Sequence, residues 1–222
     1  MVEPFLVKEC TLISIATGEE AQNLRELSDR LQTIHPGCIY YHFWGGMLRS
    51  SFDEPEYSND FAAWAWRSLH DSRLAERLAI IDPTHFKDTE ELRRELVEVI
   101  EERLSESEFV PWARSSQRFK FIRSQIVVID TGARISQSGE MGERITRMSL
   151  GSIFYHFIDA RRRTEEGRSD FVTWLRGFEE EECDEFARRI DSIDPYFTTL
   201  AALRRELSGV FGVGAAAPEA AT

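Results

Sequence analysis

The sequence predicts a mainly α-helical fold built from two similar multi-helix domains, each with a short N-terminal strand or extended arm. Internal duplication is the first reason, because residues 5–43 align with residues 119–157 without a gap, and 11 of the 39 positions are identical. Apolar residues at helical spacing in both copies are the second reason. The third is composition, since 42% of the 222 residues are apolar and can form a core in each copy.

The two copies predict the domain boundaries. After a four-residue deletion the match resumes with Asp60, Phe61 and Trp64 against Asp170, Phe171 and Trp174. A polar stretch broken by Pro111 separates the copies. We therefore expect a first helical copy over residues 1–108, a second over residues 109–212 and a disordered tail over residues 213–222, which holds no large apolar side chain beyond its first residue.

Each copy begins with a segment rich in β-favouring residues, at residues 5–15 and 119–129, and a Thr-Gly pair follows each one. Because Thr-Gly is a turn signal, we expect short strands that end there. Apolar residues then recur at helical spacing in the first copy, at Leu24, Leu27, Leu31 and Ile34. Glycine at positions 37 and 151 is expected to stop this helix.

Four more helices are predicted in each copy. In the first copy, one carries the sequence of residues 39–43, and another is capped by Asn59 or Asp60. The next is expected to end before Pro83, because proline disfavours helical geometry at the preceding residue. The last begins at Asp88, which lies three residues before Glu91 at capping-box spacing.

Charge and cysteine content limit the partners and the compartment. The formal net charge is −12, which repels phosphate backbones and anionic lipids, so we expect no nucleic acid and no membrane partner. The charge is uneven, with a net −11 in residues 1–108 and −1 in the remainder. The three cysteines show no paired spacing, which predicts neither disulfides nor a zinc site. We expect a soluble, cytoplasmic protein without a cofactor.

The candidate ligand-binding residues are polar or aromatic side chains that recur in both copies. Imidazole can act as a general base or metal ligand when a carboxylate orients its second nitrogen, and an aromatic ring can stack on a sugar. Structural roles are the alternative: a buried histidine paired with an aspartate, an aspartate that caps a helix, and a buried tryptophan. The candidates are Tyr41, His42, Asp60, Trp64, Tyr155, His156, Asp170 and Trp174.

The second copy also carries three consecutive arginines, Arg161, Arg162 and Arg163. Such a run is typical of a solvated helix end, and an anion site is the alternative.

Four motifs of the first copy together resemble a known prokaryotic family, domain of unknown function 5752. They are Ile-Tyr-Tyr-His at 39–42, Asn-Asp-Phe-Ala-x-Trp at 59–64, Leu-Ala-Glu-Arg-Leu-Ala-x-Ile-Asp at 74–82 and Glu-Leu-Arg at 91–93. The resemblance covers about 100 residues of the first copy and, more weakly, the second, which suggests a duplicated form of a single-copy domain. It implies genomic proximity to carbohydrate-active enzymes such as glycosyltransferases, and it implies no activity.

Two classes of function fit these observations. One is a non-catalytic binding or regulatory module with a protein or a small, carbohydrate-related molecule as its partner. The other is an enzyme or metal-binding protein that uses His42, His156, Asp60 and Asp170 at a pseudo-symmetric site. We favour the first, with no catalytic residue and no metal. We also expect each histidine to bond the aspartate of its own copy and both tryptophans to be buried.

Overall fold

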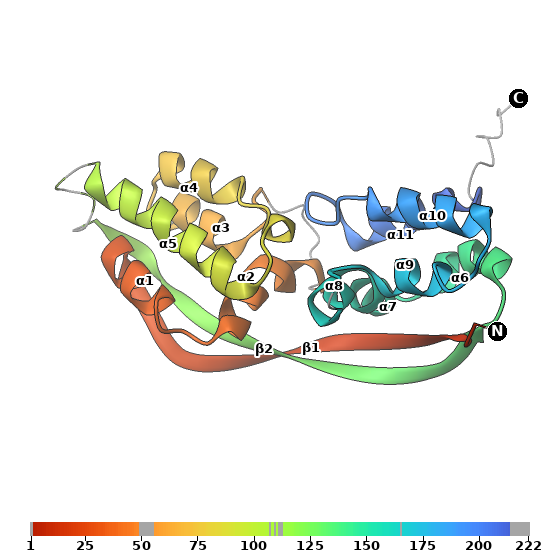
Figure 1. Cartoon of the computed structure of the whole chain (residues 1–222). Helices are drawn as coiled ribbons and strands as arrows, with labels where there is room; N and C mark the ends of the chain where they lie inside the picture. The colour runs from red at the N-terminus through yellow and green to blue at the C-terminus, as the bar shows by residue number, and fades with distance from the viewer. Residues whose placement is uncertain are drawn as a thin grey trace, which may run out of the picture. The chain divides into compact units, whose positions relative to one another are not determined.

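The computed structural model describes residues 2–48, 56–106, 108, 110, 113–164 and 166–213. Two long strands, β1 (Phe5–Asn23) and β2 (Arg114–Ile135), each precede a series of helices (Figure 1). After β1 come α1 (Leu24–Leu31), α2 (Pro36–Leu48), α3 (Asp60–Arg67), α4 (Ser72–Ala79), η1 (Pro83–His85) and α5 (Thr89–Ser105). After β2 come η3 (Ser138–Glu140), α6 (Met141–Arg147), α7 (Leu150–Ile153), η4 (Phe154–Asp159), α8 (Ala160–Arg163), α9 (Asp170–Leu175), α10 (Glu181–Asp191) and α11 (Leu200–Val210).

The two strands pair with each other in a two-stranded antiparallel sheet. Side-chain hydrogen bonds give the register: Thr17 donates to the carbonyl of Phe121 over 2.7 Å, and Thr131 donates to the carbonyl of Val7 over 2.6 Å. The prediction of a mainly α fold with short strands or arms is therefore wrong. The strands are 19 and 22 residues long, because their backbones pair beyond the point where the sequence gives a turn signal.

The Thr-Gly pairs lie inside the strands and do not end them. Gly18 and Gly132 have φ values of 81° and 77°, a conformation that glycine adopts without strain. The preceding threonine hydroxyls accept hydrogen bonds from the amides of Glu19 and Ala133. Each pair thus forms a local irregularity like a β-bulge, after which the strand continues.

The chain divides into two compact units that both contain strand residues. Unit 2 is Leu12–Ile126, and unit 1 combines Met1–Thr11 with Val127–Thr222. Each strand therefore contributes to both units. The sequence predicts a boundary between the two copies at residues 108 and 109, and this boundary remains a prediction. The predicted tail lies outside the described residues, apart from Val213.

Unit 2 contains the five α-helices that the first copy predicts. Helix α3 packs against α4, and α1 packs against α5. Leu24, Leu27 and Leu31 lie on the buried face of α1, as their spacing predicts. Helix α4 ends at Ala79, before Pro83, and the side chain of Asp88 caps α5 by accepting the amide of Glu91.

The segment of unit 1 that corresponds to α2 of unit 2 is not a single regular α-helix. Helix α7, the π-helix η4 and α8 follow one another without a break over residues 150–163. Helix α9 packs against α10, and α6 packs against α11. Phe154, Phe157 and Phe171 are fully buried in this unit.

The glycines at positions 37 and 151 do not stop a helix. The preceding helices end earlier, at Leu31 and Arg147, and each glycine is the second residue of the next helix. A Cβ atom at Gly151 would collide with the carbonyl oxygen of Cys10 on β1. Glycine is thus explained at position 151 by the close approach of α7 to the strand.

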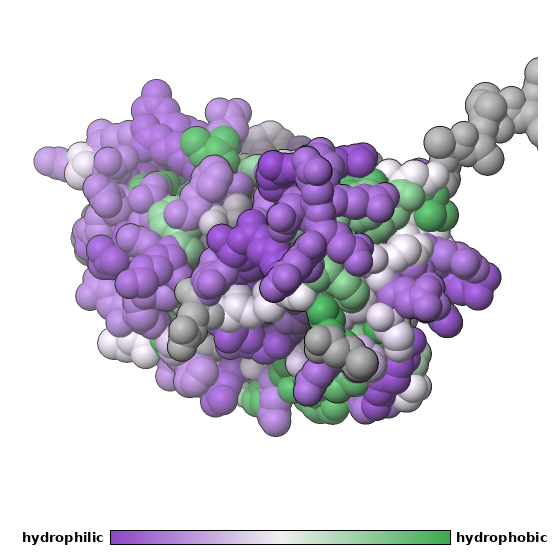
Figure 2. All heavy atoms as spheres, turned by 45° about the vertical axis from the view of Figure 1, so that its right-hand side comes forward, coloured by the Kyte–Doolittle hydropathy of each residue, from purple (hydrophilic) through white to green (hydrophobic). Residues whose placement is uncertain are grey.

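The surface view in Figure 2 is mostly hydrophilic, with smaller hydrophobic areas between the hydrophilic residues. Among the described residues, no helix has both the length and the apolar character needed to cross a membrane.

Candidate functional site

His42 lies on α2 with 3% of its surface exposed, and both of its ring nitrogens have partners in unit 2. The Nδ1 atom lies 2.8 Å from Oδ2 of Asp60, the first residue of α3. The Nε2 atom accepts a hydrogen bond of 3.1 Å from the backbone amide of Ile122 on β2. The ring thus connects a helix, the start of a second helix and a strand.

His156 makes the same connections in unit 1, where 2% of its surface is exposed. Its Nδ1 atom lies 2.7 Å from Oδ2 of Asp170, the first residue of α9. Its Nε2 atom accepts a hydrogen bond of 2.9 Å from the amide of Lys8 on β1. The predicted pairing of each histidine with the aspartate of its own copy is confirmed.

These contacts define the protonation state of both rings. A backbone amide only donates, so Nε2 must accept with its lone pair, and the proton must be on Nδ1. That proton is donated to the aspartate. Each imidazole is therefore neutral, and neither lone pair nor proton remains for a substrate or a metal ion in this arrangement.

The two tryptophans also form hydrogen bonds with the backbone of the strands. The indole Nε1 of Trp64 donates to the carbonyl of Gln117 over 2.7 Å, and that of Trp174 donates to the carbonyl of Glu3 over 2.8 Å. In each unit a histidine accepts a hydrogen bond from a backbone amide of a strand, and a tryptophan donates one to a backbone carbonyl. Such contacts satisfy backbone groups that would otherwise be unpaired at a sheet edge.

Burial of the tryptophans differs between the units. Trp64 has 7% of its surface exposed, so its predicted burial is confirmed. Trp174 is only half-buried, so the same prediction is wrong for unit 1. Its ring packs at the edge of Phe178, with centroids 4.8 Å apart.

A strand phenylalanine packs against each histidine. Phe119 on β2 lies 4.7 Å from the ring of His42 and stacks on Phe61 with centroids 5.0 Å apart. Phe5 on β1 lies 4.7 Å from the ring of His156 and stacks on Phe171 at 5.3 Å. Each strand phenylalanine is thus buried against the helices of the other sequence copy.

The two tyrosines are buried beside the histidines. Tyr41 lies at the edge of the His42 ring, and its hydroxyl accepts a hydrogen bond of 3.2 Å from Ser14. Tyr155 lies in the same way beside His156, and the guanidinium of Arg163 lies 4.0 Å above its ring. Burial raises the pKa of Tyr155, so its hydroxyl is neutral at physiological pH.

Arg163, which the sequence analysis interpreted as part of a solvated helix end, contacts the same aspartate as His156. It donates to Asp170 over 2.9 Å and also to Asp159, which is 1% exposed and lies four residues earlier on the same helical segment. Burial raises the pKa of Asp170, but the hydrogen bonds from His156 and Arg163 outweigh burial and lower it. The signal available in the sequence was the i, i+4 spacing of Asp159 and Arg163.

Of the two caps predicted for α3, Asn59 is confirmed, whereas the capping role considered for Asp60 and Asp170 is wrong. The side chains of Asn59 and Ser169 cap α3 and α9 by accepting the amides of Ala62 and Val172. Because the caps lie one residue earlier, the aspartate carboxylates are available to the histidines.

No group of three or more His, Cys, Asp or Glu side chains in the described ranges is arranged to hold a metal ion. Burial raises the pKa of the Cys38 thiol, which opposes formation of a thiolate at this position of α2. Each histidine–aspartate pair belongs to its own unit.

The residues described here define a helical protein with a long two-stranded sheet, and the chain belongs to a family of unknown function, DUF5752, whose profile matches residues 2–212. The match therefore extends across both sequence copies and is longer than the 100 residues of the motif resemblance. A similar solved structure is that of OrfY from Thermoproteus tenax, with 29% sequence identity, a match over 97% of either protein and a TM-score of 0.80. The search of curated proteins finds no match.

Proposed function

We propose that the protein is a non-catalytic binding or regulatory module whose histidines hold the strand edges to the helices. One observation carries the proposal: both nitrogens of His42 and of His156 are occupied by protein groups. A general base needs a lone pair that can reach a substrate proton, and here the strand amide uses it. The histidine–aspartate pairs then stabilise a framework on which binding surfaces lie.

We infer a partner from charge and from the family resemblance. A net charge of −12 disfavours nucleic acid and anionic membranes, which supports a protein or a small molecule as the partner. The resemblance to a family encoded near carbohydrate-active enzymes supports a role alongside such enzymes, with a carbohydrate-related ligand or partner. This role is that of a soluble protein in the cytoplasm.

We also infer that a tandem duplication produced the two copies. Equivalent hydrogen bonds recur at positions 114 apart on the strands: Ile122 matches Lys8, Gln117 matches Glu3 and Phe121 matches Val7. The helix side chains that meet them also match, His42 with His156 and Trp64 with Trp174. In this proposal each copy contributes its first strand residues to the helical core of the other copy.

Elemental analysis combined with chemical unfolding tests the structural role of the histidines. We expect purified protein to hold far less than one zinc, iron or manganese per molecule, and His42→Ala with His156→Ala to lower the unfolding midpoint strongly. About one metal ion per molecule that is lost in the double variant, with the midpoint unchanged, would overturn the proposal in favour of a metalloprotein.

A further inference from the structure

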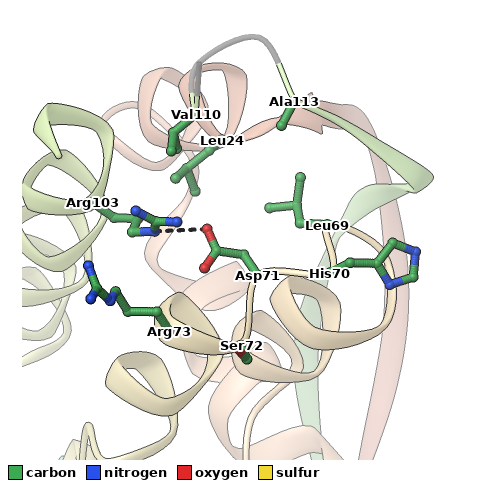
Figure 3. A pocket seen from close by; sticks show the side chains of 9 residues that line it. All are labelled: Leu24, Leu69, His70, Asp71, Ser72, Arg73, Arg103, Val110 and Ala113. Atoms are coloured by element: carbon green, nitrogen blue, oxygen red, sulfur yellow. Dashed lines mark hydrogen bonds and ion pairs between the residues drawn. The ribbon is translucent and has the colours of Figure 1, made fainter. Parts of the chain in front are cut away.

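Unit 2 contains a cavity of about 370 Å³ away from the histidine cluster. It lies between the start of α1, the connection from α3 to α4 and the end of α5 (Figure 3). Leu24, Leu69 and Val110 form its apolar side, while Asp71, Arg73 and Arg103 form its charged side. A cavity of this size with an apolar wall and a few polar groups has the composition of a small-molecule site.

The three charged lining residues, Asp71, Arg73 and Arg103, belong to a cluster that also includes Arg77 and Glu106, which do not line the cavity. Arg103 donates to Asp71 over 2.9 Å and to Glu106 over 2.8 Å. Glu106 also accepts hydrogen bonds from Arg73 over 2.9 Å and makes an ion pair of 2.6 Å with Arg77. Three guanidinium groups against two carboxylates leave one net positive charge in this cluster.

The cluster also has donors that the protein does not use. Within the described parts of the chain, Nη2 of Arg103 and Nη2 of Arg73, which both line the cavity, make no hydrogen bond. The hydrogen bonds from Arg73 and Arg77 lower the pKa of Glu106 to about 2, so its carboxylate is ionised at neutral pH. The surplus charge therefore does not come from a protonated carboxyl group.

His70 lines the cavity but lies apart from the arginine cluster. Its ring points away from Asp71 and Arg103 in Figure 3, and its side chain is exposed. The residue has a φ of 58°, which places Leu69 and Asp71 on the two sides of a sharp bend.

We propose that this cavity binds a small organic anion, with its carboxylate or phosphate group on the guanidinium groups of Arg73 and Arg103. Its apolar body would lie against Leu24, Leu69 and Val110. Guanidinium groups suit both acids, because their planar N–H groups match two oxygens of a carboxylate or phosphate. The inference rests on the proposed function, since it treats the protein as one that binds a ligand without transforming it.

Calorimetric titration of the full-length protein with phenyl phosphate and with benzoate tests the site. Both probes carry an acidic group on an apolar body, and comparison of the two identifies the preferred acid. We expect saturable binding at low ionic strength, and binding at least about tenfold weaker for inorganic phosphate and for benzyl alcohol, which each lack one of the two features.

Matched variants distinguish this cavity from general attraction to arginine. Arg73→Gln changes a lining side chain that is 66% exposed, and Arg25→Gln changes a 49% exposed arginine of the same unit that pairs with Glu101 outside the cavity. We expect Arg73→Gln to weaken phenyl phosphate binding about fivefold or more and Arg25→Gln to leave it unchanged.

Absence of saturable binding of both probes, or equal loss in the two variants, would overturn the site. Neither result affects the metal analysis that tests the role of the histidines. Conversion of phenyl phosphate to phenol and phosphate by the pure protein would instead overturn the non-catalytic function while leaving the site in place.

Discussion

In unit 1 and in unit 2 the same types of helix side chain contact the backbone of the strands. The burial of these side chains differs between the two units. In both, an imidazole accepts a strand amide and an indole donates to a strand carbonyl. The aspartate partner is 22% exposed in unit 1 and 33% exposed in unit 2, and the tryptophan is half-buried in unit 1 but 7% exposed in unit 2. The comparison shows that the strand-edge contacts are the shared part of the framework, and that the burial of the groups around them varies.

The helices that carry the histidines differ as well. His42 lies in a regular α-helix of 13 residues, whereas His156 lies in the π-helical segment η4. A π-helix has a wider turn, which changes the direction of the side chains that follow it. Both histidines nevertheless reach a strand amide, so the contact itself is not a consequence of one helix geometry.

The largest effect is expected from removal of either ring. His42→Ala and His156→Ala each leave a strand amide without its acceptor and an aspartate without its donor, and they open a cavity. We predict a loss of about 3 kcal/mol in the free energy of unfolding for each variant, measured by urea denaturation.

The matched control is His85→Ala, which removes an imidazole that is 80% exposed in unit 2. It should change the free energy of unfolding by less than about 0.5 kcal/mol. Equal effects of His42→Ala and His85→Ala would show that the buried ring is not a structural connection.

A second prediction tests the exchange of strand residues between the sequence copies. Phe5→Ala removes a ring that packs on Phe171, and Phe119→Ala removes one that packs on Phe61. We expect Phe5→Ala to increase hydrogen exchange mainly in α9 and η4, and Phe119→Ala to increase it mainly in α3 and α2. Each should cost about 3 kcal/mol or more. The reverse pattern, with each variant loosening the helices of its own copy, would contradict the exchange.

The sequence allowed prediction of the local elements better than of their assembly. The spacing of Leu24, Leu27 and Leu31, the cap at Asp88 and the position of Pro83 predict helices that the structure contains. The long sheet could not be predicted, because pairing of β1 with β2 joins residues that lie about 100 positions apart. The Thr-Gly signal describes a change in local backbone direction, and it does not show whether the strand continues afterwards.

The candidate site was predicted in part. The pairing of His42 with Asp60 could be predicted from the sequence, because a histidine and an aspartate recur at matching positions in both copies. The partners of Nε2 are backbone amides of β1 and β2, and a backbone amide has no residue signature. The role of Arg163 was missed because a run of three arginines is typical of a solvated surface, whereas this one lies against Asp159 and Asp170.

The smallest effect concerns the pH dependence of stability in unit 1. The pKa of Asp170 lies below its usual value of 3.8, because the hydrogen bonds of His156 and Arg163 outweigh the effect of burial. A carboxyl group whose pKa is lower in the folded state stabilises the fold at any pH above its pKa in the unfolded state. This stabilisation is lost as the pH falls through the pKa of the folded state. We predict that the stability difference between the native protein and Asp170→Asn shrinks between about pH 5 and pH 3.

Glu143→Gln is the control for the loss of a carboxylate in the same unit, because that carboxylate is 65% exposed in a surface pair with Arg147. Because this carboxylate lies at the surface, we expect the substitution to change the free energy of unfolding by less than about 0.5 kcal/mol at neutral pH. A difference for Asp170→Asn that grows as the pH falls would contradict the lowered pKa.

The protonation state of the two rings tests the structural role of the histidines most directly. Long-range ¹H–¹⁵N correlation spectra of the full-length protein at neutral pH distinguish the Nδ1–H form, the Nε2–H form and the imidazolium. We predict that His42 and His156 are both neutral with the proton on Nδ1, and that Nε2 has the shift of an acceptor nitrogen. An Nε2–H form or an imidazolium at either position would contradict the hydrogen bond from the strand amide, and with it the role assigned to the histidines.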